Sequence, residues 1–297
     1  MSPVSRWLAC LSLCLSAWAQ AGPAVLIADL NGRYGSTEYH ARVAEAVAAI
    51  IALEPEAVVI AGDMIAGQAK PALSDEHIAA MWASFDQVVY QPLKAEGIEV
   101  LAVPGNHDAS IYAAYSHERQ AYERFWRSRA PAGISEGSQF PWYYNVTLDA
   151  GRFVGLDVTA PGALSDEQER FLEQHREAAK SDDQRLLIAS HLPLYPLAVG
   201  RNAQIFSSSL QPEPGEIWVS GHHHVFYAGV DAGGGLMLGL PPLGGNRRAW
   251  IGGEERSPFG FVSLSDDGTP SLYAWPGLGP EATAIGPSEL GALRRLE

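Results

Sequence analysis

The chain has 297 residues, of which 47% are hydrophobic, and its 34 acidic and 20 basic residues give a formal net charge of −14. This length and apolar share suffice for a buried core, which disfavours a disordered chain, a collagen and a coiled coil. The acidic balance argues against broad binding to nucleic-acid phosphates or to an anionic membrane surface.

Residues 1–21 have the composition of a secretory signal peptide. Arg6 precedes an apolar run that ends at Trp18, and the small residues Ala19 and Ala21 offer cleavage positions. The run is shorter than the roughly 20 residues that span a bilayer. We therefore expect cleavage rather than a retained membrane anchor, and export to the periplasm or secretion from the cell.

The two cysteines, Cys10 and Cys14, both lie in this leader. The mature chain would then contain no disulfide, no thiol nucleophile and no cysteine-ligated zinc. Any metal site must use histidine, aspartate, asparagine or glutamate. We expect one domain at residues 22–276, a polar tail at 277–297, and no transmembrane anchor after cleavage.

Short apolar runs alternate with helix-like segments from Ala24 onward. Such runs are typical of strands buried on both faces. They cover residues 24–30, 57–61, 99–103 and 186–190.

Apolar residues at helical spacing predict three helices between these runs. The first follows Ser36-Thr37, the second follows Ser74, and the third begins at Ser165, which forms a capping-box pattern with Gln168 and continues to about Ala179.

Two pairs of strand-like runs predict hairpins, at residues 142–148 with 153–158 and at 259–264 with 272–275. Together the elements predict an α/β architecture of two sheets with helices outside them.

Polar and glycine-containing segments follow the strand-like runs. Functional groups collect beyond the carboxyl ends of strands in open α/β sheets, because the loops there converge on one crevice. The segments are Asp29-Leu30-Asn31-Gly32, Gly62-Asp63, Gly105-Asn106-His107-Asp108, Ser190-His191 and Gly221-His222-His223-His224.

Each segment alone also fits an ordinary turn or a hydrogen-bonded histidine. Their succession at the ends of buried strands favours a metal site instead. Carboxylate, imidazole and amide groups are the ligands that hard and borderline divalent ions require, and a pair of ions needs a bridging carboxylate.

With these segments, the chain resembles the calcineurin-like metallophosphoesterase superfamily from about Ala24 to Tyr227. The resemblance implies a four-layer αββα sandwich, two mixed sheets flanked by helices, with a dinuclear site for divalent or trivalent ions such as Mn, Fe, Zn or Mg. The implied ligands are Asp29 and His224 for the first metal, Asp63 as the bridge, and Asn106, His191 and His222 for the second.

The resemblance further implies that His107, oriented by Asp108, is the non-ligand acid that meets the phosphate or protonates the leaving oxygen. It implies an enzyme that hydrolyses phosphomonoesters or phosphodiesters by attack of a metal-bridging hydroxide. In an extended segment, His222 and His224 would point to one side and His223 to the other, so we expect His223 not to be a ligand.

Asn31 stands where the family usually has a second histidine. An amide oxygen is a weaker ligand than imidazole for transition metals. Three interpretations are open: Asn31 ligates a harder ion such as Mn²⁺ or Mg²⁺, another side chain such as Tyr34 fills the gap, or the first site is weakly occupied.

Cationic side chains in the loops near these segments are candidates for clamping a phosphate. Arg33 and Arg201 are the preferred candidates, ahead of Arg247 and Arg248. Tyr34 is a further candidate for the substrate pocket, as is Tyr195.

The expected partner is a small phosphate ester, with no nucleic acid. The alternative is a catalytically degenerate periplasmic protein that binds a metal or a phosphorylated ligand, which Asn31 motivates. A simple metal-binding protein built on His222, His223 and His224 explains less, because it leaves Asp29 and Asp63 without a role. Substrate, native metals and oligomeric state are open.

Overall fold

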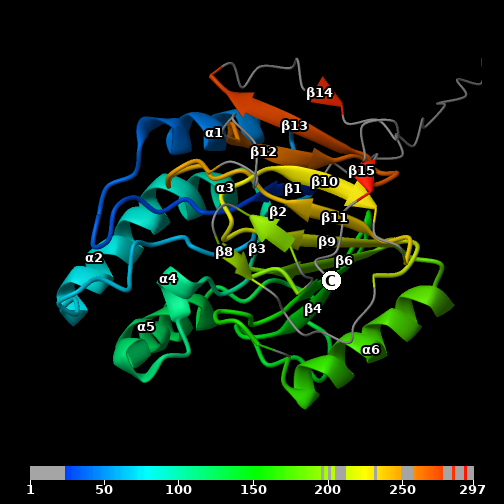
Figure 1. The fold of residues 1–297 in the computed structure, drawn as a ribbon, viewed down its shortest axis with the longest axis horizontal. Coiled ribbons are helices and arrows are strands. Elements are labelled where there is room, and N and C mark those ends of the chain that lie inside the picture. Colours follow the sequence, from blue (N-terminus) through cyan, green and yellow to red (C-terminus); the bar gives the residue numbers. More distant parts are fainter. Residues whose placement is uncertain are drawn as a thin grey trace, which may run out of the picture.

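Figure 1 shows the computed structural model of the chain. It describes residues 24–162, 164–194, 197–199, 202–204, 212–230, 233–248, 257–276, 283–284 and 291–292. The expected leader lies outside the described residues.

The helices follow the predicted order, with additions between the second and third. The α-helices are α1 (Ala41–Ile51), α2 (Asp75–Phe85), α3 (Gln91–Ala95), α4 (Asn106–Ala109), α5 (Ser116–Arg127) and α6 (Asp166–Ser181). A π-helical turn, η1 (Asp86–Tyr90), joins α2 to α3, and a 3-10 turn, η2 (Ala113–Tyr115), precedes α5.

Local capping decides where these helices begin. The Ser74 side chain accepts a hydrogen bond from the backbone of His77, as a helix N-cap should. The helix expected after Ser36-Thr37 starts later, at Ala41, because Ser36 bonds within its own turn to Glu38 and His40 caps α1 instead.

The capping box predicted at Ser165 is only half formed. Ser165 accepts a hydrogen bond from the backbone of Gln168. The Gln168 side chain, however, bonds to the backbone N–H and carbonyl of Asp157. Gln168 therefore ties α6 to the loop after the neighbouring strand.

The first sheet has six strands, in the order β14-β13-β12-β1-β2-β3. Its parallel part is β1 (Ala24–Ile27), β2 (Ala57–Ile60) and β3 (Glu99–Ala102). The antiparallel hairpin β12 (Phe259–Leu264) and β13 (Pro270–Trp275) extends it, as predicted, and β14 (Thr283–Ala284) pairs with β13.

The second sheet has seven strands, in the order β15-β10-β11-β9-β6-β5-β4. The predicted hairpin is present as β4 (Tyr144–Leu148) and β5 (Gly151–Gly155). The other members are β6 (Leu186–Ser190), β9 (Glu216–Ser220), β10 (Tyr227–Val230), β11 (Leu236–Gly239) and β15 (Gly291–Ala292). A separate pair consists of β7 (Leu197–Val199) and β8 (Asn202–Gln204).

Three layers of apolar side chains separate four layers of structure. In β1, Val25 and Ile27 pack with the buried faces of α1, α2 and α5, whereas Leu26 packs between the two sheets. On the other side, Ile188 of the second sheet packs with Phe171 of α6. Figure 1 shows α1 and α6 on opposite sides of the two sheets. The predicted αββα sandwich is confirmed.

Several parts of this fold were not predicted from the sequence. Helix α5 is rich in charged residues, and it buries Tyr122 and Trp126, which lie four residues apart on one face. Strands β9 to β11 also escaped prediction, although β9 directly precedes the segment of three histidines. The two short strands β14 and β15 fall in the part expected to be a tail.

Among the residues that the structure describes, no helix is both long enough and apolar enough to cross a membrane.

Candidate metal centre

Five loops bring the predicted segments to one place. Asp29, Asp63 and Asn106 follow the parallel strands β1, β2 and β3, and His191 and His222 follow the parallel strands β6 and β9. Parallel neighbours end at the same edge of a sheet, so these side chains gather at the carboxyl edge of both sheets.

The backbone is strained where these side chains leave it. Asp29, Asp63, His222 and His224 all have positive φ, between 52° and 65°. Non-glycine residues seldom adopt this left-handed conformation, and it clusters at functional sites. The expectation of an extended segment at 222–224 is therefore wrong. A tight turn, rather than strand alternation, directs these histidines.

Glycines make room for this packing. A Cβ added at Gly105 would lie 2.0 Å from the backbone nitrogen of Asp63, and one added at Gly62 would lie 2.5 Å from Nδ1 of His191. Both distances are too short for a real atom, so side chains at either position would displace the site residues.

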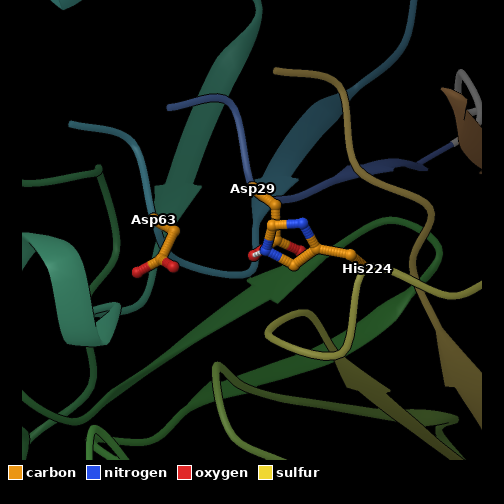
Figure 2. A group of neighbouring side chains, drawn as sticks. All are labelled: Asp29, Asp63 and His224. Atoms are coloured by element: carbon orange, nitrogen blue, oxygen red, sulfur yellow. Dashed lines mark ion pairs between the residues drawn. The ribbon is translucent and has the colours of Figure 1, made fainter. Parts of the chain in front are cut away.

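Asp29, Asp63 and His224 form one compact group. Each offers a ligand-type atom, and these atoms lie within 4.8 Å of one another (Figure 2). Nε2 of His224 is 3.4 Å from Asp29 Oδ1, and its Nδ1 is 2.6 Å from the carbonyl oxygen of Asn246. A carbonyl only accepts, so Nδ1 carries a proton and Nε2 faces Asp29.

Asn31 lies beside this group. It is buried, and its backbone nitrogen donates to the carbonyl of Asp63 at 3.2 Å. A Cβ built on Gly245 would lie 3.7 Å from Asn31 Oδ1 and 2.5 Å from Cε1 of His224, which places the amide oxygen on the His224 side of the site. Tyr34 is exposed instead, with its ring against His107.

Asn106, His191 and His222 form a second group. Oδ1 of Asn106 is 3.0 Å from Nε2 of His191 and 2.8 Å from Nδ1 of His222. Nδ1 of His191 is bonded to the Ala61 carbonyl at 2.8 Å, so this nitrogen carries the ring proton of the neutral form. Oδ2 of Asp63 lies 3.2 Å from the other nitrogen of His191, which puts Asp63 between the two groups.

The electrostatics of the site match a place for cations. Burial raises the pKa of Asp29, although nearby His224 opposes this rise. Burial alone would lower the pKa of His191, but the charge of Asp63 outweighs burial and raises that pKa to about 9. Burial and the charge of His191 hold the pKa of His222 well below its usual range. At neutral pH the His191 ring therefore carries positive charge next to Asp63, whereas His222 stays neutral. Positive charge is thus favoured between these oxygens, which fits a site for a divalent ion.

His107 is held by the backbone rather than by Asp108. Its Nδ1 lies 2.9 Å from the carbonyl oxygen of Gly67 and its Nε2 lies 3.9 Å from Asp63 Oδ2. Asp108 instead accepts hydrogen bonds from the backbone of Ile65 and Gly105. The expected orienting role of Asp108 is corrected, because its carboxylate faces the loop after β2.

Burial raises the pKa of Asp108 to about 7, and the charge of Asp63 adds to this rise. Through its hydrogen bonds from Ile65 and Gly105, Asp108 joins the loop after β2 to the loop after β3 from inside the protein. Its place is structural support of the site, not contact with a substrate.

The structure describes some of the candidate substrate residues and not others. Arg33 and Tyr34 are exposed, and the Tyr34 ring centroid lies 5.0 Å from that of His107. Arg201 and Tyr195 lie outside the described residues. Arg248 is bound to the histidine turn: its backbone nitrogen donates to the carbonyl of His224 at 3.1 Å.

His223 is buried, with its ring centroid 5.6 Å from that of His222. Neither of its ring nitrogens has a hydrogen-bond partner, and burial lowers its pKa to about 4. The expectation that His223 is not a ligand remains a prediction. A tight turn at residues 222–224 replaces the extended segment on which it was based.

Sequence reasoning missed Arg42. This buried residue of α1 donates to the carbonyls of Leu243 and Gly244, both at 2.5 Å. The backbone of Gly244 in turn donates to the carbonyl of Asp29 at 2.8 Å. A charged residue next to Val43 on the apolar face of a helix was the available signal.

The comparisons with known proteins identify the family of the chain. The family model of the calcineurin-like phosphoesterases matches residues 22–226, more than half of the chain. The chain belongs to this family, whose members are metal-dependent phosphoesterases, a class of hydrolase. No curated protein matches the sequence.

A solved structure shows the same fold. A dimetal phosphatase from Danio rerio superposes with a TM-score of 0.58 at 16% identity, covering 90% of this chain and 99% of that one. Yfce, a phosphoesterase from E. coli, superposes with a TM-score of 0.41 at 16% identity, covering 89% of this chain and all of the other.

Proposed function

We propose that the chain hydrolyses phosphomonoesters or phosphodiesters at a centre for two metal ions. The observation that carries the proposal is the position of Asp63. Its carboxylate belongs to the compact group with Asp29 and His224, and it also lies 3.2 Å from His191 in the second group. One carboxylate between two sets of ligand atoms is the arrangement that a pair of ions requires.

Each group would hold one ion. Asp29, Asn31 and His224 would hold the first, Asn106, His191 and His222 the second, and Asp63 would be shared. Bound divalent ions lower the pKa of a coordinated water and neutralise charge on phosphate oxygens. The identity of the ions is open, and the amide oxygen of Asn31 favours a harder one such as Mn²⁺ or Mg²⁺.

His107 would hold the proton for the leaving oxygen. Its Nδ1 proton is committed to the Gly67 carbonyl, so Nε2 is the nitrogen that can exchange a proton with a substrate. Its side chain is 18% exposed, enough to meet a bound ester at the mouth of the site.

Exposed side chains of the loops that form the site would contact the substrate. The Tyr34 ring can pack against a planar leaving group, and Arg33 and Arg248, both exposed, can meet phosphate oxygens. The substrate is therefore proposed to be a small phosphate ester.

Export is part of the proposal and rests on the sequence of residues 1–21. Amino-terminal sequencing of the protein recovered from cell fractions tests it. A mature chain that begins at Gln20 or Gly22, in the periplasm or the medium, is expected, and an uncleaved cytoplasmic chain would contradict it.

The decisive experiment measures metal content together with turnover. Purified protein is assayed for bound ions per chain and for Mn²⁺-dependent hydrolysis of an aryl phosphate and a bis-aryl phosphate, with His107→Ala alongside. About two ions per chain, with turnover that His107→Ala greatly reduces, are expected. The better of the two esters then gives the mono- or diesterase class.

One observation favours a second candidate, a metal- or phosphate-binding protein without turnover. Asn31 replaces a stronger imidazole ligand on the His224 side of the site. One ion per chain, with no hydrolysis of either ester in excess Mn²⁺, would support this candidate and overturn the enzyme.

A further inference from the structure

A buried carboxylate from helix α5 holds the loop that follows β2. Glu118, in the first turn of α5, is fully buried. The backbone nitrogen of Gln68 donates to this carboxylate, with both oxygens at 3.0 Å. Burying a carboxylate costs free energy unless hydrogen bonds or charges compensate. The hydrogen bond from Gln68 offsets part of this cost, which a surface glutamate would not have.

The backbone that Glu118 holds is in an unusual conformation. Gln68 has a φ of +62°, in the left-handed region. A Cβ added at Gly67 would lie 2.2 Å from the carbonyl oxygen of His107 and 2.7 Å from Oε2 of Glu118. The main chain at residues 67–68 is therefore packed between α4 on one side and Glu118 on the other.

Each of these two residues contacts one residue of the site. The Gly67 carbonyl accepts a hydrogen bond from Nδ1 of His107 at 2.9 Å. The Gln68 side chain accepts one from Nδ2 of Asn106 at 3.2 Å.

These contacts set the direction of both site residues. With Nδ2 bonded to Gln68, Oδ1 of Asn106 faces His191 and His222. With Nδ1 bonded to Gly67, His107 is left with Nε2 as its free nitrogen. The amide orientation thus follows from the Gln68 side chain and the tautomer from the Gly67 carbonyl, and both depend on how the backbone at residues 67–68 is held.

We infer that Glu118 is a positioning residue of the metal centre, which acts through Gly67 and Gln68 on His107 and Asn106. Its effect on turnover rests on the proposed function, whereas its effect on metal binding rests on the contacts alone. The two readouts therefore separate failure of this inference from failure of the proposed function.

The test compares two substitutions of nearly equal volume. Glu118→Gln keeps an oxygen that can accept from Gln68, and Glu118→Leu removes it. Glu118→Leu should weaken the binding of one Mn²⁺ roughly 10- to 100-fold, as is typical when a partner of a metal ligand is lost. It should also lower kcat more than it changes KM, and Glu118→Gln should stay close to wild type in both respects.

Glu123→Ala is the matched control. Glu123 lies on the same helix and forms an ion pair with Arg127 at the surface. It should leave Mn²⁺ affinity, kcat and KM unchanged.

A folded Glu118→Leu variant with wild-type Mn²⁺ affinity would overturn the inference, as would a Glu118→Gln variant as defective as Glu118→Leu. If Glu118→Leu fails to fold, Gln68→Asn decides. Asparagine tolerates the left-handed φ but is one methylene too short to reach Asn106. Weaker Mn²⁺ binding in that variant supports the inference, and unchanged binding overturns it.

Turnover separates the two proposals. If the wild type hydrolyses no phosphate ester while Glu118→Leu loses Mn²⁺, the positioning role stands and the proposed enzyme activity fails.

Discussion

Asp63 and His107 are joined through the main chain. The backbone nitrogen of His107 donates to Oδ1 of Asp63 at 2.8 Å, while Oδ2 of Asp63 faces His191 at 3.2 Å. Burial alone would raise the pKa of Asp63, but the charges of His191 and His107 outweigh it and hold that pKa below its usual range. The carboxylate that would bridge two ions thus also places the proton donor.

Asp63→Asn tests this double role. An asparagine oxygen can still accept from the His107 backbone, but it lacks the charge that a shared ligand needs. We expect loss of bound metal and a fall in kcat of more than roughly 100-fold. This fall exceeds the one that is typical when a residue that only contacts a metal ligand is replaced. Metal analysis and steady-state kinetics check this. Hydrolysis at the wild-type rate would contradict the proposed mechanism.

His107→Ala should separate chemistry from metal binding. Its Nε2 would protonate the leaving oxygen, so kcat should fall by roughly 10² to 10⁴ with metal content unchanged. The loss should be smaller for a nitrophenyl ester, whose leaving group needs little protonation, than for an alkyl ester. Equal losses for both esters would show that His107 does not act as the acid.

Asn31→His should change the preference among metals. An imidazole in place of the amide oxygen favours transition metals, so the affinity ratio of Zn²⁺ to Mn²⁺ should rise roughly tenfold. Competition titrations of the two ions measure it, with Asn31→Asp as a control that adds an oxygen ligand. An unchanged ratio in Asn31→His would place residue 31 outside the ligand set.

Tyr34→Ala should weaken the binding of aryl substrates. Loss of an aromatic contact costs about 0.5–1.5 kcal/mol, or roughly 2- to 12-fold in KM. An alkyl phosphate should be little affected, because it has no ring to stack. Tyr112→Ala provides the control, since Tyr112 is similarly exposed. Equal effects of the two substitutions would remove Tyr34 from the substrate site.

His175 should make stability fall in mild acid. Burial, with a smaller contribution from the charge of Arg152, lowers its pKa from 6.5 to about 4. The unfolded chain binds this proton more readily, so the stability that His175 contributes is complete above about pH 6.5 and is lost as the pH falls toward 4. Melting temperatures at pH 7.5 and 5 should therefore differ less in His175→Leu than in wild type. An equal difference in both proteins would contradict this.

Local patterns were enough to predict much of the fold. The runs that became β1, β2, β3 and β6 are apolar apart from Glu99 at the start of β3 and Ser190 at the end of β6. A strand buried on both faces requires a largely apolar composition. Helix α5 was missed although Tyr122 and Trp126 lie at helical spacing, because its apolar stripe is short and its buried face also includes the charged Glu118. Tertiary packing against α2 and Trp142 stabilises those aromatics.

The candidate site was also predicted only in part from the sequence. Asp29, Asp63, Asn106, His191, His222 and His224 were all found as ligand types next to strand ends. The roles of Glu118, Gln68 and Arg42 were not found, because each depends on contacts between distant segments. Glu118 and Arg42 bond to backbone groups of other loops, and the Gln68 side chain bonds to Asn106.

The sequence by itself determined which side chains stand at the ends of which strands, since strand propensity and the position of polar residues are local properties. Only the tertiary structure decided that Gly67 rather than Asp108 orients His107, and that Asn106 presents its oxygen to His191 and His222. A hydrogen bond depends on where two atoms meet in space. Residues 68 and 118 meet only because α5 packs beside the loop after β2.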